Sequence, residues 1–180
     1  MAQEPLPTND ADSEPERVAQ RYARRDAAAD DLYSALRPEV WQARQERQRA
    51  LLSVLARHAP RPLDELDVLE IGCGTGANLL ELASLGFDSA RLVGNELLAA
   101  RAERARAQLP AATRLHEGDA LALPFAPASF DIVLQSTVFS SLLDEAFAQR
   151  LAGRMWDWVR PGGYRWLNAL PWLRDRKSVV

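Results

Sequence analysis

Alternating glycines at residues 70–76, EIGCGTG, are the clearest sign of chemistry in the sequence. They follow the apolar residues Val68 and Leu69 and precede a helical pattern that begins at Ala77. Glycine permits a tight turn and lets a ligand approach the backbone without a Cβ atom in the way. Doubly wound sheets bind nucleotide-like ligands at such a turn, where the first strand ends.

The glycines alone leave more than one ligand open. Gly72, Gly74 and Ala77 also satisfy the G-x-G-x-x-G/A pattern of dinucleotide-binding proteins, so a nicotinamide-dependent oxidoreductase is one alternative. A turn that only packs a helix against a strand is another. The neighbouring charged residues are needed to choose between them.

Three acidic residues stand where three successive predicted strands end. Glu70 lies two residues before the first glycine, where a carboxylate suits a cationic group and would repel a pyrophosphate. Glu96 follows Gly76 by 20 residues, and a carboxylate there can accept both hydroxyl groups of a ribose. Asp119 follows the third predicted strand, where it could meet an adenine amino group. We therefore expect a ligand with a nucleoside part and a cationic part.

Short apolar runs alternate with helical patterns along most of the chain. Strands are expected at residues 68–71, 91–95, 113–116, 131–135 and 164–167, and helices at residues 77–85, 97–109 and 144–159, the last ended by the Pro-Gly-Gly turn at 161–163. This order predicts an α/β fold with a Rossmann-like, doubly wound, mostly parallel sheet and helices on both faces. The carboxyl ends of parallel strands share one edge, so this fold would bring the three acids together.

The same residues resemble the class I methyltransferases that use S-adenosylmethionine. The motifs that carry the resemblance are EIGCGTG at 70–76, VGNEL at 93–97, EGDALALPF at 117–125, SFDIVLQS at 129–136 and VRPGG at 159–163. Together they span about residues 66–168. The second motif departs mildly from the family, because Asn95-Glu96 stands where an apolar residue and Asp are usual.

The resemblance implies S-adenosylmethionine as cofactor and transfer of its methyl group to an oxygen, nitrogen or carbon nucleophile of a small-molecule acceptor. Asp119 and Ala120 would edge the adenine, Glu96 would bind the ribose, and Gln135 would lie near the methionine moiety. The cofactor-binding residues implied are Glu70, Gly72, Cys73, Gly74, Gly76, Glu96, Leu97, Asp119, Ala120 and Gln135. No metal site is expected, and the acceptor itself is not predicted.

No side chain stands out as a catalytic base. We interpret His116 as a structural residue at a strand end, and His58 as a residue that suits the dipole at a helix end. Cys73 has no histidine nearby in sequence to activate it as a nucleophile. Core or lid positions are expected for Trp156, Trp158, Trp166 and Trp172. Transfer from a sulfonium depends mainly on positioning, so a base is needed only if the acceptor must lose a proton.

Composition restricts the class of protein. The chain has 180 residues, 47% hydrophobic and 26% charged, which is typical of one soluble globular domain. Its net charge of −3, and the sequence QSTVF at 135–139 in place of an Asn/Asp-Pro-Pro-aromatic motif, disfavour a nucleic-acid acceptor. There is no apolar stretch of about 18 residues, no secretory signal and a single cysteine, Cys73, so we expect a cytoplasmic protein without a membrane span.

Four regions are predicted along the chain. They are a disordered tail at 1–15, an N-terminal helical cap at 16–60, the methyltransferase core at 61–173 and an irregular tail at 174–180. The residues around 22–25 also resemble the cap of some methyltransferases of this family. Arg44, Arg47 and Arg49 are expected to form a solvated helix face.

The C-terminal region departs from the family, whose members continue to an antiparallel sixth and seventh strand. We expect both strands to be missing here. The codons of residues 175–180 would resemble a sequencing adapter, and Lys177 is the only lysine in the chain, so a shortened reading frame is our hypothesis. A non-catalytic cofactor-binding module or inactive fragment is therefore the main alternative to an active enzyme.

Overall fold

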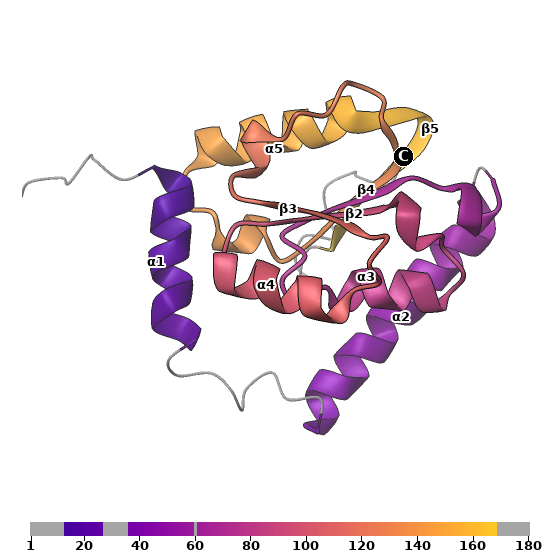
Figure 1. Cartoon of the computed structure of the whole chain (residues 1–180), viewed down its shortest axis with the longest axis horizontal. Coiled ribbons are helices and arrows are strands. Elements are labelled where there is room, and N and C mark those ends of the chain that lie inside the picture. Colours follow the sequence, from indigo (N-terminus) through magenta and orange to yellow (C-terminus); the bar gives the residue numbers. More distant parts are fainter. Residues whose placement is uncertain (1–12, 27–35, 60, 169–180) are drawn as a thin grey trace, which may run out of the picture.

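The computed structural model describes residues 13–26, 36–59 and 61–168 (Figure 1). The helices are α1 (Glu14–Asp26), α2 (Pro38–His58), α3 (Ala77–Ser84), α4 (Ala99–Gln108) and α5 (Glu145–Trp158). The strands are β1 (Val68–Ile71), β2 (Leu92–Glu96), β3 (Arg114–Glu117), β4 (Phe130–Ser136) and β5 (Val159–Asn168), and short 3-10 turns include η3 (Ala120–Ala122).

The five strands of the described residues form one parallel sheet in the order β3-β2-β1-β4-β5. This confirms the predicted α/β fold with a doubly wound sheet. The chain runs outward from β1 through β2 and β3, then crosses to the other side of β1 to form β4 and β5. Ligands bind in open α/β sheets where the strand order reverses in this way, beyond the carboxyl ends of the central strands.

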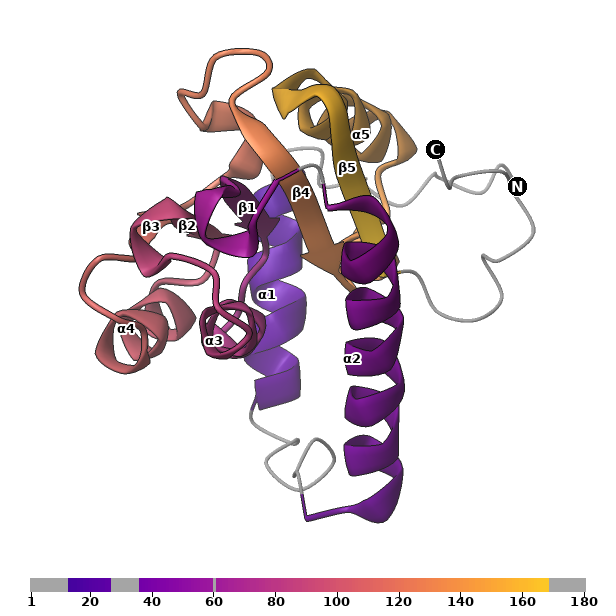
Figure 2. The same ribbon diagram turned by 90° about the vertical axis from the view of Figure 1, so that its right-hand side faces the viewer.

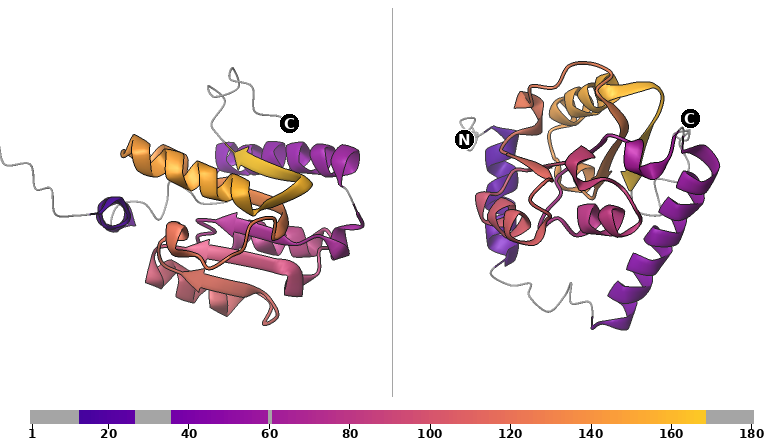
Figure 3. Two further views of the ribbon diagram at one scale, coloured as in Figure 1. Left: turned by 90° about the horizontal axis from the view of Figure 1, so that it is seen from above. Right: turned by 45° about the vertical axis from the view of Figure 1, so that its right-hand side comes forward.

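Helices cover both faces of the sheet, as predicted. On one face, α5 contributes Phe147, Leu151, Met155 and Trp158 to a core that includes Leu69, Val93 and Val133. On the other, Leu55, Leu79, Leu82 and Ala105 from α2, α3 and α4 pack against Val68, Leu92, Ile132 and Leu134. Figure 3 shows α5 on one side of the sheet and α3 and α4 on the other. Because successive strand residues point to opposite faces, strands buried on both sides are continuously apolar.

The structure corrects two predicted boundaries. Helix α1 begins at Glu14, inside the segment assigned to a disordered tail, and the Glu14 side chain is buried among charged partners that the sequence does not reveal. Residues 1–12 and 169–180, which include the predicted tail at 174–180 and Trp172, lie outside the described residues.

The second correction concerns the last strand. The Pro-Gly-Gly sequence at 161–163 was expected to form a turn before the strand, but β5 already begins at Val159. Pairing with β4 shifts register there: Phe130 lies opposite Val159, and Ile132 lies opposite Tyr164. The intervening residues therefore bulge from the ladder, which is how a proline can lie within a strand.

An ionic network closes the amino-terminal edge of the central strands. Asp131 Oδ2 accepts hydrogen bonds from Arg61 Nη2 at 2.6 Å, Arg160 Nη1 at 2.7 Å and the Asp67 N–H at 2.9 Å. Arg160 also donates to Asp67 Oδ2 at 2.8 Å, and Arg91 donates to Asp67 Oδ1 at 3.0 Å. The network joins the starts of β1, β4 and β5 at the edge opposite the strand ends that carry the three predicted acids.

Candidate functional site

A cavity with a volume of about 280 Å³ opens at the carboxyl ends of β1, β2 and β3. Glu70, Glu96 and Asp119 all line it, so the three acids share one site. The predicted residues that line it are Glu70, Gly72, Cys73, Gly74, Glu96, Leu97, Asp119 and Ala120. The volume is close to the lower end, about 300 Å³, of the range for small-molecule sites.

The glycine turn connects β1 to α3 along one wall of this cavity. Gly72 has φ of +66°, which side-chain-bearing residues rarely adopt, and a Cβ atom there would collide with Cγ2 of Val138. The Cys73 N–H donates to the Asn95 carbonyl at 2.9 Å, which ties the turn to the end of β2. The turn therefore needs glycine for both its conformation and its close approach to the loop after β4.

Glu96 is held rigidly at the end of β2. Its Oε2 accepts a hydrogen bond from the Gly74 N–H at 2.8 Å, and its Oε1 accepts one from the Leu98 N–H at 2.9 Å. The residue is only 5% exposed and lines the cavity. A carboxylate has about four acceptor positions, so Glu96 can still accept two further hydrogen bonds, one at each oxygen. That geometry fits a pair of neighbouring hydroxyl groups.

Glu70 is fully buried and incompletely satisfied. Asn78 Nδ2 donates to its Oε1 at 2.5 Å, but its Oε2 has no hydrogen-bond partner among the described residues. Burial raises the pKa of Glu70 to about 7, against the opposing influence of Asn78 and the more distant Arg47. An unpaired buried carboxylate oxygen is costly, so the site fits a ligand that brings a cationic donor to it. The ammonium group of S-adenosylmethionine has that chemistry.

Asp119 lines the cavity beyond the end of β3. Its Oδ1 accepts from the Leu121 N–H at 2.9 Å and caps η3. The preceding residue, Gly118, donates its N–H to the Glu96 carbonyl at 2.9 Å and accepts from Asn95 Nδ2 at 2.9 Å. Asn95, which departs from the usual apolar residue of the second motif, thus fastens the ends of β2 and β3 together.

Two predicted cofactor residues do not line the cavity. Gly76 is buried at the start of α3, and a Cβ atom on it would lie 2.9 Å from Leu109 Cγ, so it serves helix packing. Gln135 is 2% exposed, and its Oε1 accepts from the Val138 N–H at 2.8 Å. Successive side chains of a strand point to opposite faces of the sheet. The side chain of Gln135 therefore holds the loop after β4 without lining the cavity.

Helix α1 forms a further wall of the cavity, which the sequence motifs indicated only weakly. Its Pro15, Val18 and Tyr22 line the cavity. The Tyr22 hydroxyl lies 2.8 Å from Ser141 Oγ, and Arg21 Nη2 donates to the Ser141 carbonyl at 2.8 Å. Figure 2, turned by 90° from Figure 1, separates α1 from the longer helix α2. The weak resemblance around residues 22–25 was the only signal for this wall.

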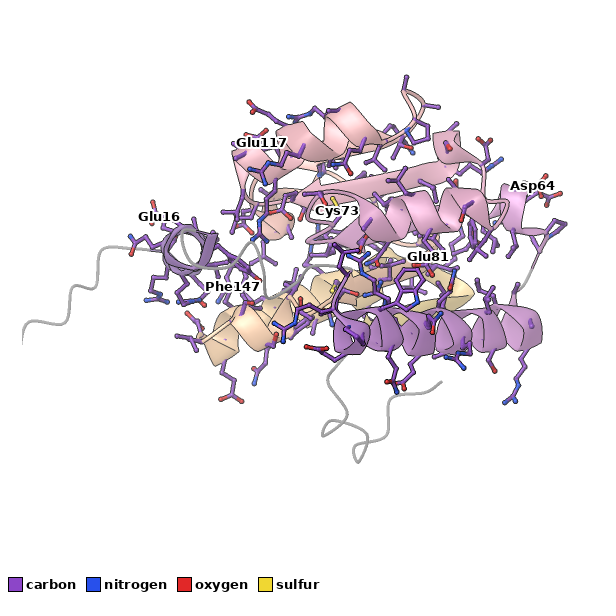
Figure 4. The ribbon with its side chains drawn as sticks, turned by 90° about the horizontal axis from the view of Figure 1, so that it is seen from below. Glu16, Asp64, Cys73, Glu81, Glu117 and Phe147 are labelled. Carbon is purple, nitrogen blue, oxygen red and sulfur yellow. The ribbon has the colours of Figure 1, made fainter. Side chains whose placement is uncertain are left out.

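The prediction of a solvated arginine face on α2 holds for Arg44 and Arg49, which are exposed, whereas Arg47 is partly buried. Arg44 and Arg47 line the cavity, and Arg47 Nη2 lies 3.9 Å from Glu81 Oε2 on α3. Figure 4 shows Glu81 between α3 and α2. The spacing of residues 44, 47, 51 and 55 places both arginines on the helix stripe that carries the buried Leu55. That periodicity could have identified them.

Arg101 on α4 is a third arginine of the cavity wall. Its guanidinium carbon lies 4.5 Å from the centre of the Tyr22 ring, a cation–π distance that links α4 to α1. No pattern in the sequence associates these two residues, which are far apart in the chain.

The remaining candidates for chemistry are structural. The His116 ring packs edge-on against Phe125 with 5.1 Å between centroids, and burial lowers its pKa. Burial also raises the pKa of the Cys73 thiol far above neutrality, so it stays protonated and is a poor nucleophile. Trp158 is fully buried as expected, whereas Trp156 is 56% exposed and lies outside the core. The side chains of His58 and Trp166 lie outside the described residues.

The comparisons with known proteins agree on one family. The family model described as a methyltransferase domain matches residues 68–163, which is more than half of the chain. This stretch begins at β1 and contains all three acids of the cavity. It does not support the alternative of a nicotinamide-dependent oxidoreductase.

Three relatives illustrate the match. The chain is 33% identical over 125 residues to the biotin biosynthesis bifunctional protein BioHC of Cellvibrio japonicus, covering 68% of this chain and 23% of that protein. It is 34% identical over 119 residues to demethylmenaquinone methyltransferase of Deinococcus radiodurans, covering 64% and 46%. The structure of CalS10 with bound S-adenosylmethionine, an amino pentose methyltransferase from Micromonospora echinaspora, is 31% identical with a TM-score of 0.54, covering 74% and 57%.

The chain spans less than half the length of these two curated relatives. The region that the family model matches, residues 68–163, contains this chain's glycine turn and the acids at its three strand ends. On its family match and its fold, the chain belongs to the class I S-adenosylmethionine-dependent methyltransferases.

Proposed function

We propose that this protein binds S-adenosylmethionine in the cavity at the ends of β1–β3 and transfers its methyl group to a small-molecule acceptor. The observation that carries the proposal is the convergence of Glu70, Glu96 and Asp119 on one cavity beside the glycine turn. The three acids lie in different surroundings. Together they match the separate chemical parts of a nucleoside that bears a charged amino acid.

Each acid has one role in the proposed complex. Glu96, fixed by two backbone N–H groups, accepts the two ribose hydroxyls. Asp119, fixed through Oδ1, edges the adenine together with Ala120. Glu70 offers its unpartnered Oε2 to the ammonium group of the methionine moiety. The bare backbone of Gly72 and Gly74 lets the ligand approach the sheet edge closely.

The protein's contribution to the reaction is positioning. When bound, S-adenosylmethionine would supply a methyl group that its sulfonium already activates, and the remainder of the cofactor would leave as S-adenosylhomocysteine. Holding two reactants in line can supply effective molarities of about 10⁵ M or more. Neither His116 nor Cys73 is suited to act as a base, so the proposed acceptor reacts through a nucleophile that needs no strong base from this chain.

A small acceptor fits the enclosure of the site. Val18 and Tyr22 of α1 and Leu142 after β4 line the cavity, and its volume of about 280 Å³ suits a small molecule. The names of two relatives, demethylmenaquinone methyltransferase and trans-aconitate 2-methyltransferase, also specify small molecules. No helix within residues 13–26, 36–59 and 61–168 combines the length and apolar character needed to cross a bilayer. A cytoplasmic location remains our expectation.

Two measurements on the purified chain test the proposal. Calorimetric titration with S-adenosylhomocysteine should give saturable binding, whereas NADH should give none. Incubation with methyl-labelled S-adenosylmethionine and a metabolite extract should then transfer the label to a small molecule. Absence of binding at millimolar ligand would contradict the proposal. Binding without transfer to any acceptor would favour the non-catalytic module instead.

A further inference from the structure

The cavity carries an unusual share of positive charge for a site that receives a cationic cofactor. Its charged lining consists of Arg44, Arg47, Arg101, Glu70, Glu96 and Asp119. The arginines and the acids balance in number. The burial that raises the pKa of Glu70 to about 7 weakens the negative side of this balance near neutral pH.

Cofactor binding would shift the balance further. S-adenosylmethionine carries a sulfonium, an ammonium and a carboxylate, so it adds one net positive charge. The acids are also committed to it, because Glu96 and Asp119 face its nucleoside and Glu70 its ammonium in the proposed complex. The occupied cavity is therefore electropositive. An excess of positive charge in a partly buried cavity favours an anionic acceptor over a cationic one.

Two of the arginines lie on α2, away from the nucleoside end of the cavity. Arg44 and Arg47 are one helical turn apart and line the same wall. Glu81 Oε2 lies 3.9 Å from Arg47 Nη2, and Glu81 Oε1 is buried without a hydrogen-bond partner among the described residues. Glu81 therefore attracts the Arg47 guanidinium from the α3 side through a long ion pair. Arg101 instead stacks on Tyr22.

Apolar side chains also line the cavity, beside the hydroxyl-bearing Tyr22, Thr137 and Ser141. They are Val18 from α1, Leu142 from the loop after β4, and Phe147 and Leu151 from α5. An acceptor with an apolar body that fills this space would bury apolar surface against them. The wall thus offers two guanidinium groups from one helix and an apolar surface from others.

We infer that the methyl acceptor is a small amphipathic anion whose acidic head group pairs with Arg44 and Arg47 while its apolar body packs against α1 and α5. A guanidinium binds a carboxylate or a phosphate with the same bidentate geometry, so the shared chemistry is an anionic oxygen head group. The inference rests on the proposed function and adds the class of acceptor to it.

The test separates head-group recognition from cofactor binding. Octanoate and octyl phosphate serve as anionic probes, and octanamide and octylamine as matched neutral and cationic probes. Each is titrated into protein saturated with S-adenosylhomocysteine. At least one anion should bind, at least tenfold more tightly than the amide and the amine. The relative affinity of the two anions then distinguishes a carboxylate from a phosphate acceptor.

Substitutions locate the head group. Arg44→Gln and Arg47→Gln should each weaken binding of the anion tenfold or more. Arg44 is not among the groups that act on the pKa of Glu70, so Arg44→Gln should change the affinity for S-adenosylhomocysteine less than twofold. Arg49→Gln is the matched control, because Arg49 is exposed on α2 and donates to the backbone carbonyl of Gln45. It should change neither affinity.

Three results would overturn the inference. One is equal binding of the anions, the amide and the amine. Another is a loss of S-adenosylhomocysteine affinity in Arg44→Gln with unchanged affinity for 5′-methylthioadenosine, which lacks the amino acid. That pattern would assign Arg44 to the cofactor's own carboxylate. The third is failure of the unsubstituted protein to bind S-adenosylhomocysteine. That result would also overturn the proposed function, which distinguishes it from the first two.

Discussion

The carboxylate of Glu14 accepts a hydrogen bond of 2.8 Å from the backbone N–H of Leu143, a residue 129 positions further along the chain. Arg17 and Arg21 donate to the same carboxylate at 2.9 and 2.7 Å. Burial alone would raise the pKa of Glu14, but these hydrogen bonds outweigh it and hold the pKa below its ordinary value. A buried, ionised Glu14 therefore fastens α1 to the loop before α5, and α1 closes one side of the cavity.

Glu14→Ala should loosen α1 without unfolding the sheet. Leaving the Leu143 N–H and Arg21 without this carboxylate costs about 1–3 kcal/mol, which is enough to raise the open population of α1 about fivefold or more. Hydrogen exchange followed by mass spectrometry should show faster exchange in residues 14–23 and unchanged exchange in β1 and β4. The control is Glu103→Ala, since Glu103 is an exposed glutamate on α4, whereas Glu16 (Figure 4) accepts hydrogen bonds from Ser13 at the start of α1. Equal exchange in both variants would show that Glu14 does not hold the helix.

Glu96→Ala should weaken binding of S-adenosylhomocysteine about ten- to a hundredfold. The substitution removes charge-assisted hydrogen bonds to the ribose, worth roughly 1.5–3 kcal/mol. Calorimetric titration measures the effect directly. Glu103→Ala, at an exposed position on α4, is the matched control and should bind like the unsubstituted protein. An unchanged dissociation constant for Glu96→Ala would remove Glu96 from the site.

Binding of S-adenosylhomocysteine should release a proton from Glu70. Burial raises the pKa of Glu70 to about 7 in the free protein, and an ammonium group placed beside it favours the ionised form. Affinity should therefore fall as the pH drops from 7 to 6, by up to about tenfold. Titrations at pH 6.5 in buffers of different ionisation enthalpy count the released protons. Glu70→Gln, which cannot titrate, should give none, and equal proton release in both proteins would exclude Glu70 as the source.

The same group should make the free protein less stable at high pH. Its pKa is about 7 in the folded state against 4.5 when unfolded, so the folded state binds the proton more tightly. The free energy of unfolding contributed by Glu70 is then highest below pH 4.5 and falls as pH rises to 7, by about 2–4 kcal/mol in total. Urea unfolding at pH 8 should find Glu70→Gln more stable than the unsubstituted protein. A less stable variant at pH 8 would contradict this assignment.

Asp131→Asn should destabilise the fold through the opposite edge of the sheet. Burial raises the pKa of Asp131, but hydrogen bonds from the Asp67 N–H and Arg61 outweigh it and keep the pKa low. Loss of the charge leaves Arg61 without this carboxylate and Arg160 with Asp67 alone, at a cost of about 1–3 kcal/mol because both arginines are partly exposed.

The pH dependence of that loss has the usual sign for a paired carboxylate. The stabilisation is present above the unfolded pKa of 3.8 and disappears as pH falls through the lower folded value. Thermal unfolding at pH 7 and pH 3 should therefore show the difference between Asp131→Asn and the unsubstituted protein shrinking in acid. Asp157→Asn, at an exposed position on α5, should show no difference at either pH.

Local patterns in the sequence were sufficient for the sheet and for much of the site. The strand Val68–Ile71 is buried on both faces, so its largely apolar sequence predicted a strand. The glycine turn after it requires a positive φ at Gly72. Glu70, Glu96 and Asp119 could be assigned to one cavity because parallel strands end at a common edge. These features depend on residues within a few positions of one another and on the rule that orders the strands.

Only the tertiary structure decided which more distant side chains reach the cavity. Gln135 bonds beneath the loop after β4 instead of facing the site, and Arg47 faces the site instead of solvent. Glu14 is buried because Arg17, Arg21 and Leu143 meet it from two elements. The sequence by itself determined the strands, the turn and the three acids, since these follow from local periodicity. The direction of a side chain on a helix far away in the chain depends on how that helix packs, which no local pattern specifies.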